Sequence, residues 1–236
     1  MPYKKSQSAE SVVLDPSSPP DAAVIWLHGL GADGFDFVPI VEELRLPPTM
    51  AVRFVFPHAR PRPVTINNGF VMRAWYDITS LGPDRVEDGA GIRESAEVVR
   101  GYIEQQKAAG IASGRIVIAG FSQGGAIAFQ AALRHPQRLG GVMALSTYLP
   151  LRESLAAEAS PANRDVPILM CHGVRDQMLP AALGTASRDF LQSLGYAVEW
   201  KAYPMEHSVC MEEVLDISKW LQARFSRSVL TPDPKP

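Results

Sequence analysis

One stretch, residues 115–133, limits what this chain can fold into more than any other. It begins with the β-branched run Ile-Val-Ile at 116–118, which predicts a strand buried on both faces. It ends with the alanine-rich residues 126–133, which favour a helix. Between them, Gly-Phe-Ser-Gln-Gly at 120–124 matches G-x-S-x-G in the strand–turn–helix context that this motif requires. We therefore predict Ser122 to be a nucleophile.

The two glycines of this motif have a steric role. At Gly120 and Gly124 the neighbouring chain is expected to pass so close that a β-carbon would clash, while the turn holds Ser122 in a strained conformation. The serine hydroxyl would then lie at a helix N-terminus, where backbone N–H groups stabilise a developing oxyanion. The alternative is a glycine-rich turn that only packs a helix on a sheet.

Strand and helix patterns alternate along the rest of the chain. Buried strands are predicted at 22–27, 52–56, 141–146, 167–172 and 197–203, and helices at 35–46, 88–109, 181–194 and 209–225. Residues 11–14 form at best a short edge strand, and 57–87 are expected to be irregular. The alternation indicates an α/β fold with a mostly parallel sheet and helices on both faces. We expect a single domain over 1–236, with flexible tails at 1–10 and 228–236.

Composition excludes several classes of function. The net charge is −2 over 236 residues, without a basic cluster, which argues against nucleic acid as a partner. No apolar stretch approaches the ~20 residues that a membrane span needs, so we expect no membrane insertion. The N-terminus lacks the apolar region of a secretory signal, and two cysteines make no disulfide framework. These features favour a cytoplasmic location.

Partners for Ser122 are predicted from strand ends, because active sites of such sheets lie beyond the carboxyl ends of the strands. Asp176 follows the strand predicted at 167–172, and His207 follows the last strand. A serine needs a general base, here His207, and an acidic residue, here Asp176, to hold the base in the correct tautomer. Ser, Asp, His is also the chain order of α/β-hydrolases.

Other candidates fit less well. The remaining histidines lie in a glycine loop, in a proline-rich arm, at a helix end and at a strand end, respectively His28, His58, His135 and His172. Among acidic residues, Asp165 precedes its strand and Asp189 falls inside a helix. Neither Cys171 nor Cys210 lies on a sharp strand-to-helix turn, so neither is expected to be a nucleophile.

An oxyanion hole needs two donors. The first is expected to be the backbone N–H of Gln123, the residue after the nucleophile. The second should come from the loop after the first buried strand, which reads His-Gly-Leu-Gly at 28–31, and we predict the N–H of Leu30.

Several motifs together resemble one family. They are His-Gly-Leu-Gly at 28–31, Trp-Tyr-Asp at 75–77, Gly-Phe-Ser-Gln-Gly-Gly at 120–125, Leu-Ser-Thr-Tyr-Leu-Pro at 145–150, His172-Gly with Asp176, and His207-Ser. The chain from about 12 to 225 resembles the carboxylesterase / acyl-protein thioesterase (phospholipase/carboxylesterase) family of small α/β-hydrolases. The resemblance implies the same triad and oxyanion donors, about seven strands, ester or thioester substrates with acyl chains, and no cofactor or metal. Members of this family are cytosolic and some form homodimers, so the resemblance further implies a cytosolic location and allows a homodimer.

One residue departs from the family pattern. Where bacterial relatives often carry a small residue before the histidine, this chain has Glu206. We expect either that Glu206 points to solvent or that it raises the pKa of His207 and moves the acid limb of activity upward.

The substrate site is predicted to be open. Only about twenty residues separate the strands at 141–146 and 167–172, too few for a helical cap domain. We expect a shallow apolar groove for a short to medium acyl chain, lined by Leu30, Val71, Met72, Trp75, Leu149, Met178 and Leu179. The alternative for these residues is ordinary core packing.

Three functions remain open from sequence. The first is a serine esterase or thioesterase that acts on a small-molecule ester, a lysophospholipid or an acylated protein. The second is hydrolysis of another bond on the same fold, such as a peptide bond, because fold does not fix chemistry. The third is a binding module without catalysis, which would have no need for a complete triad.

Overall fold

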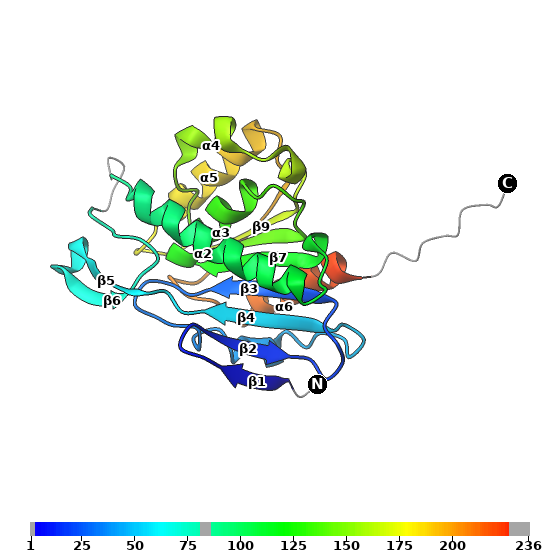
Figure 1. The fold of residues 1–236 in the computed structure, drawn as a ribbon. Coiled ribbons are helices and arrows are strands. Elements are labelled where there is room, and N and C mark those ends of the chain that lie inside the picture. Colours follow the sequence, from blue (N-terminus) through cyan, green and yellow to red (C-terminus); the bar gives the residue numbers. More distant parts are fainter. Residues whose placement is uncertain (1–2, 81–85, 227–236) are drawn as a thin grey trace.

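The computed structural model describes residues 3–80 and 86–226, and it is built around an eight-stranded sheet (Figure 1). The strand order is β1-β2-β4-β3-β7-β8-β9-β10. From β4 to β10 neighbouring strands run parallel, whereas β1 and β2 are antiparallel to their neighbours. The bounds are Lys4–Gln7 (β1), Ser11–Asp15 (β2), Ala22–Leu27 (β3), Val52–Pro57 (β4), Ile116–Phe121 (β7), Gly141–Leu145 (β8), Ile168–Gly173 (β9) and Val198–Tyr203 (β10). The predicted mostly parallel sheet is confirmed.

Helices cover both faces of the sheet because alternate side chains of the central strands point to opposite sides. In β3, Ile25 and Leu27 pack in a core with residues of α2 (Gly89–Ala108), α3 (Gln123–Leu133) and α5 (Ala181–Ser193). Val24 and Trp26 of the same strand pack in a second core with α1 (Ile40–Glu43) and α6 (Met211–Phe225). The central strands are therefore buried on both faces, as their continuous apolar runs predict.

The structure differs from expectation near the N-terminus. Residues 4–7 lie in the region expected to be flexible, but they form the edge strand β1, with all four side chains exposed. The predicted tail at 228–236 lies outside the described residues.

The helix predicted at 35–46 shortens to the four residues of α1. Pro39 has no N–H to donate to residue 35, and the turns around it use i→i−3 hydrogen bonds, Val38 to Phe35 and Ile40 to Phe37. Arg45 then adopts a left-handed conformation with φ of 45°, which ends the helix.

The proline-rich arm is ordered, where the sequence predicts irregular structure. Its strands β5 (Pro61–Val64) and β6 (Phe70–Arg73) form a hairpin of their own. Asn68 and Gly69 close the turn with φ of 55° and 72°, a pair of left-handed positions that Asn-Gly accommodates. A two-stranded hairpin leaves outer edges free, so prolines are tolerated in it. In Figure 1 the hairpin lies beyond the end toward which the β3 and β4 arrows point.

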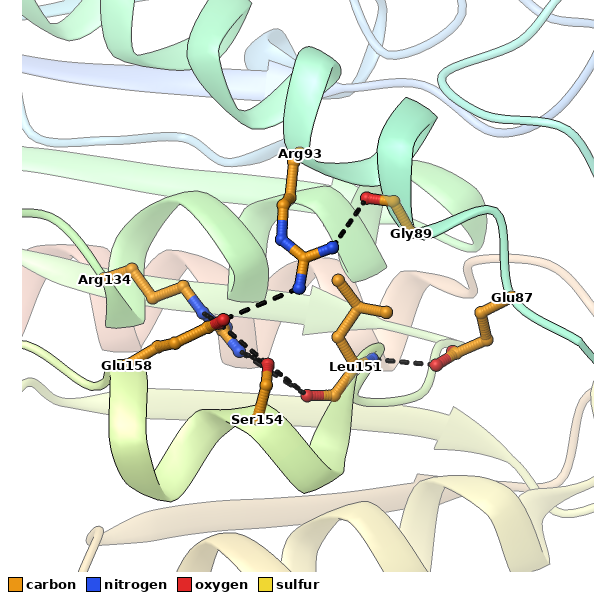
Figure 2. A network of polar contacts seen from close by, with 7 residues as sticks. All are labelled: Glu87, Gly89, Arg93, Arg134, Leu151, Ser154 and Glu158. Carbon is orange, nitrogen blue, oxygen red and sulfur yellow. Dashed lines mark hydrogen bonds and ion pairs between the residues drawn. The ribbon is translucent and has the colours of Figure 1, made fainter.

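The interval between β8 and β9, which is fully described, holds only α4 (Arg152–Glu158) and a short 3₁₀ helix. This agrees with the prediction that no large cap domain is present. Polar contacts tie α4 to α2 and α3 (Figure 2). Glu158 Oε2 accepts from Arg134 Nε at 2.6 Å and from Ser154 Oγ at 2.7 Å, and Arg93 lies on its other oxygen. Within the described residues, no helix is both long and apolar enough to cross a membrane.

Candidate active site

The turn between β7 and α3 presents Ser122 with a strained backbone, at φ 53° and ψ −120°. A β-carbon at Gly124 would lie 2.5 Å from the carbonyl oxygen of Leu27, and one at Gly120 would overlap the backbone of Gly124. The steric reason predicted for both glycines is therefore confirmed. The turn is also tied to the next strand's loop, because Thr147 Oγ1 donates to the carbonyl of Ser122 at 2.7 Å.

Asp176 and His207 reach Ser122 from two neighbouring parallel strands. Asp176 lies just after β9 and His207 just after β10, so both loops project from the same edge of the sheet. His207 Nε2 is 2.9 Å from Ser122 Oγ, and His207 Nδ1 is 2.6 Å from Asp176 Oδ2. The structure thus brings the three predicted residues together in one hydrogen-bonded chain.

The carboxylate of Asp176 is held from both sides. Its side chain is fully buried, and Oδ1 accepts from the N–H of Leu179 at 2.7 Å. His172 Nε2 lies 3.5 Å from Oδ2 and 2.8 Å from the carbonyl of Leu179. Burial is the main cause that lowers the pKa of His172, which keeps its ring neutral. The neutral ring can donate from Nε2–H to that carbonyl, so His172 binds the loop that carries Asp176 and Leu179.

The imidazole of His207 lies against an aromatic ring. Its centroid is 4.7 Å from that of Phe121, the residue before the nucleophile. With Asp176 accepting from Nδ1, the lone pair of Nε2 faces the serine hydroxyl, which is the tautomer that a general base needs. The neighbouring Glu206 is exposed to solvent, as the first of the two alternatives for it predicts.

The loops that carry the backbone N–H groups of Leu30 and Gln123 follow β3 and β7, which are parallel neighbours. Leu27 and Gly120 are paired in register, so the loops that follow them leave the sheet together. Neither N–H donates to any acceptor among the described residues, whereas Gly31 and Ala32 in the same loop both do. Two unused donors next to a nucleophile are what an oxyanion hole requires.

Other nucleophile and base candidates are occupied elsewhere. His28 Nε2 accepts from the N–H of Ala59 at 3.0 Å and Nδ1 lies 2.7 Å from the carbonyl of Gly29, while burial lowers the His28 pKa to about 4. Burial raises the pKa of the Cys171 thiol well above its ordinary value, which disfavours the reactive thiolate form. His28 and Cys171 are therefore structural groups.

The predicted groove residues separate into two groups. Trp75 and Leu149 are 2% and 4% exposed and belong to the core between the sheet and α2, so the prediction that they line an open groove is wrong. Packing beneath the arm and the loop after β8 buries them. Val71 and Met178 are well exposed, and Leu30, Met72 and Leu179 are half-buried. Met72 is the best placed, because its sulfur lies against Gly31, beside Leu30.

The side chain of Gln123 makes contacts that the sequence does not predict. It is buried at the start of α3 and bonds the backbone of the segment that follows β6. A single glutamine after the nucleophile carries no pattern from which such a long-range contact could be read.

Known proteins similar to this chain share the arrangement of the whole fold. A family described as phospholipase/carboxylesterase matches residues 8–225. Acyl-protein thioesterase 1 of Gibberella zeae is 39% identical over 223 residues, covering 91% of this chain and 95% of that protein. A probable carboxylesterase of Oryza sativa is 36% identical, covering 87% and 78%. The crystal structure of Zea mays acyl-protein thioesterase 2 superposes with a TM-score of 0.82 at 31% identity, covering 91% of this chain and 98% of that one.

Proposed function

The chain belongs to the phospholipase/carboxylesterase family of carboxylic-ester hydrolases, and we propose that it cleaves acyl esters and thioesters through an acyl-enzyme formed on Ser122. The observation that carries this proposal is the chain of two hydrogen bonds, 2.9 Å from Ser122 to His207 and 2.6 Å from His207 to Asp176. It supplies a nucleophile, a base and an orienting carboxylate at one point of the surface.

Acylation begins when Ser122 Oγ attacks the acyl carbon and its proton passes to His207 Nε2. The carbonyl oxygen becomes an oxyanion, which accepts hydrogen bonds from the N–H groups of Leu30 and Gln123. The buried Asp176 stabilises the imidazolium that forms. When the tetrahedral intermediate collapses, the alcohol or thiol leaves with the proton from His207, and the acyl group stays on Ser122.

Deacylation uses the same groups in reverse. His207 Nε2 takes a proton from a water molecule, whose oxygen attacks the acyl carbon of the acyl-enzyme. A second oxyanion forms in the same hole and collapses, and Ser122 Oγ leaves with the proton from His207. The carboxylic acid is released and the enzyme returns to its starting state.

The proposed substrate class is supported by the short interval between β8 and β9. No cap domain lies between β8 and β9, so a bulky leaving group such as a protein or a lysophospholipid can reach the serine. We expect the acyl chain to contact Met72, whose sulfur lies against Gly31, and the exposed side chains of Val71 and Met178 are further candidates for such a contact. Relatives named acyl-protein thioesterase and carboxylesterase support both ester and thioester substrates.

The test is a substrate series with a matched variant. Hydrolysis of p-nitrophenyl esters from acetate to decanoate, and of a palmitoyl thioester, is measured for the wild type and for Ser122→Ala. We expect the wild type to hydrolyse both ester types and the variant to lose the activity while keeping its fold. An inactive wild type, or a variant with equal activity, would favour the binding-module alternative.

A further inference from the structure

One short segment, residues 73–76, begins at the last residue of β6 and contacts both loops predicted to carry the oxyanion donors. The carbonyl of Arg73 accepts from the N–H of Gly31 at 2.9 Å. The indole Nε1 of Trp75 donates to the carbonyl of His28, also at 2.9 Å. Leu30 lies between these two contacts, so its loop is fixed on either side of the N–H predicted to be an oxyanion donor.

The same segment also contacts Gln123, the residue that carries the other predicted donor. Gln123 is 3% exposed, and its side-chain Oε1 accepts from the N–H of Trp75 at 2.8 Å. Its Nε2 donates to the carbonyl of Tyr76 at 2.7 Å. The amide group of Gln123 thereby makes a two-point contact with the backbone of 75–76, and its main-chain N–H is the other predicted oxyanion donor.

The segment is itself anchored on α2. Ser95 Oγ donates to the carbonyl of Trp75, and Asp88 Oδ2, at the start of that helix, accepts from the N–H of Asp77 at 3.0 Å. Trp75 is 2% exposed and is surrounded by the core. It therefore has a rigid support and no open face toward an acyl chain.

We propose that Trp75 and the side chain of Gln123 are positioning residues that set the separation of the two oxyanion donors. The inference rests on the proposed function. An oxyanion is stabilised only by donors about 2.7–3.1 Å from the place it will occupy, and such donors must be held there before the reaction. A donor displaced by about 1 Å from its productive position lowers the rate by about 10²-fold. Neither side chain has to touch the substrate to have this effect.

The first variant is Trp75→Phe, which removes the indole N–H and keeps an aromatic ring. We measure kcat and KM for p-nitrophenyl butyrate and the Ki of an alkyl boronic acid, which forms a tetrahedral adduct with a serine. We expect kcat to fall by about 10- to 100-fold, KM to stay within about twofold, and the boronic acid to bind more weakly by a factor similar to that in kcat.

Trp26→Phe is the matched control. Trp26 is 1% exposed, and its indole N–H has no acceptor among the described residues, so the substitution removes the same atoms from a core without a hydrogen bond to the oxyanion loops. Loss of stability alone would lower the melting temperature of both variants. Only Trp75→Phe is expected to lower kcat and the affinity for the boronic acid.

Gln123→Met supplies a second variant, of similar length and without the two amide contacts, and it decides the question if Trp75→Phe does not fold. The same pattern of lower kcat, unchanged KM and weaker boronic-acid binding is expected. Folded variants with kcat and Ki within about twofold of the wild type would overturn the inference. If these variants are unchanged but Ser122→Ala still abolishes activity, the proposed function stands and only the positioning role is refuted. An inactive wild type would instead refute the function itself.

Discussion

His207 Nδ1 lies 2.6 Å from Asp176 Oδ2, and the Asp176 side chain has no exposed surface. A buried carboxylate costs free energy unless it is hydrogen-bonded, and here the N–H of Leu179 and the ring of His207 provide the bonds. The carboxylate therefore fixes the tautomer of His207 in which Nε2 can accept the serine proton. The three residues come from three loops at one edge of the sheet, which makes their relation testable one residue at a time.

Asp176→Asn keeps the shape of the side chain and removes its charge. Because the amide cannot stabilise the imidazolium and favours the wrong tautomer, we expect kcat to fall by about 10³- to 10⁴-fold, as in other serine triads. Steady-state kinetics with p-nitrophenyl butyrate measures this. Asp189→Asn, at an exposed position in α5, is the control and should leave kcat unchanged. A kcat within tenfold of the wild type in Asp176→Asn would contradict the assigned role.

Glu206→Gln tests the residue beside His207. Since Glu206 is exposed, water and salt screen its charge from the imidazole. We therefore expect the acid limb of kcat/KM to lie at the same pH in the variant and the wild type. A limb displaced to lower pH in Glu206→Gln would show that the carboxylate does act on His207.

Met72→Ala tests the groove. Its sulfur lies against Gly31, so truncation removes apolar surface beside the oxyanion loop. We expect kcat/KM for p-nitrophenyl octanoate to fall by about tenfold relative to the acetate, which is the usual effect of one or two lost methylene contacts. Met50→Ala, just before β4 and thus at the amino end of the sheet, is the matched control. An unchanged octanoate-to-acetate ratio in Met72→Ala would place the acyl chain elsewhere.

Glu158→Gln tests the contacts that hold α4 (Figure 2). Hydrogen bonds from Ser154 and then Arg134 hold the pKa of Glu158 below its ordinary value. When the pKa of a carboxylate is lower in the folded state, the charged group stabilises the fold at pH values above the unfolded-state pKa. This stabilisation is lost as the pH falls through the folded-state pKa. At pH 7 we expect the variant to lose about 0.5–1 kcal/mol of unfolding free energy, given the partial exposure of the carboxylate.

Urea unfolding at several pH values measures this effect. The difference between wild type and Glu158→Gln should shrink as pH falls below about 4.3, the ordinary pKa of glutamate. Glu97→Gln, in an exposed i,i+3 pair with Arg100, is the control and should change stability little at any pH. A pH-independent difference for Glu158→Gln would point to packing instead of charge.

The catalytic triad and the strand-to-helix turn at Ser122 could be predicted because each depends on short sequence patterns. Gly120, Gly124 and the flanking strand and helix are contiguous in sequence, and strand-end logic places Asp176 and His207 at the same edge. The helix predicted at 88–109 begins where expected, and the side chain of Asp88 caps it by accepting from the N–H of Gly91. These inferences needed only periodicity, turn chemistry and the direction of parallel strands.

Long-range packing, and in one case a single proline, explain what the sequence did not predict. Trp75 resembles a groove residue because it lies in a long proline-rich arm, yet the arm folds into a hairpin whose base packs on α2 and buries the ring. Residues 4–7 carry no apolar pattern, and their strand exists because β2 presents a free edge for pairing. The helix expected at 35–46 is interrupted at Pro39. The spacing of apolar residues does not reveal that one proline removes a hydrogen-bond donor there.

The most direct measurement of the central claim is the mass of the protein during turnover. The wild type is mixed with p-nitrophenyl acetate, quenched in acid within the first turnovers, and analysed by intact-mass and peptide mass spectrometry. We expect a fraction of the chain to be heavier by one acetyl group, with the group on Ser122, and no such species in Ser122→Ala. Hydrolysis that continues in Ser122→Ala, or an acetyl group found on another residue as the turnover intermediate, would contradict it.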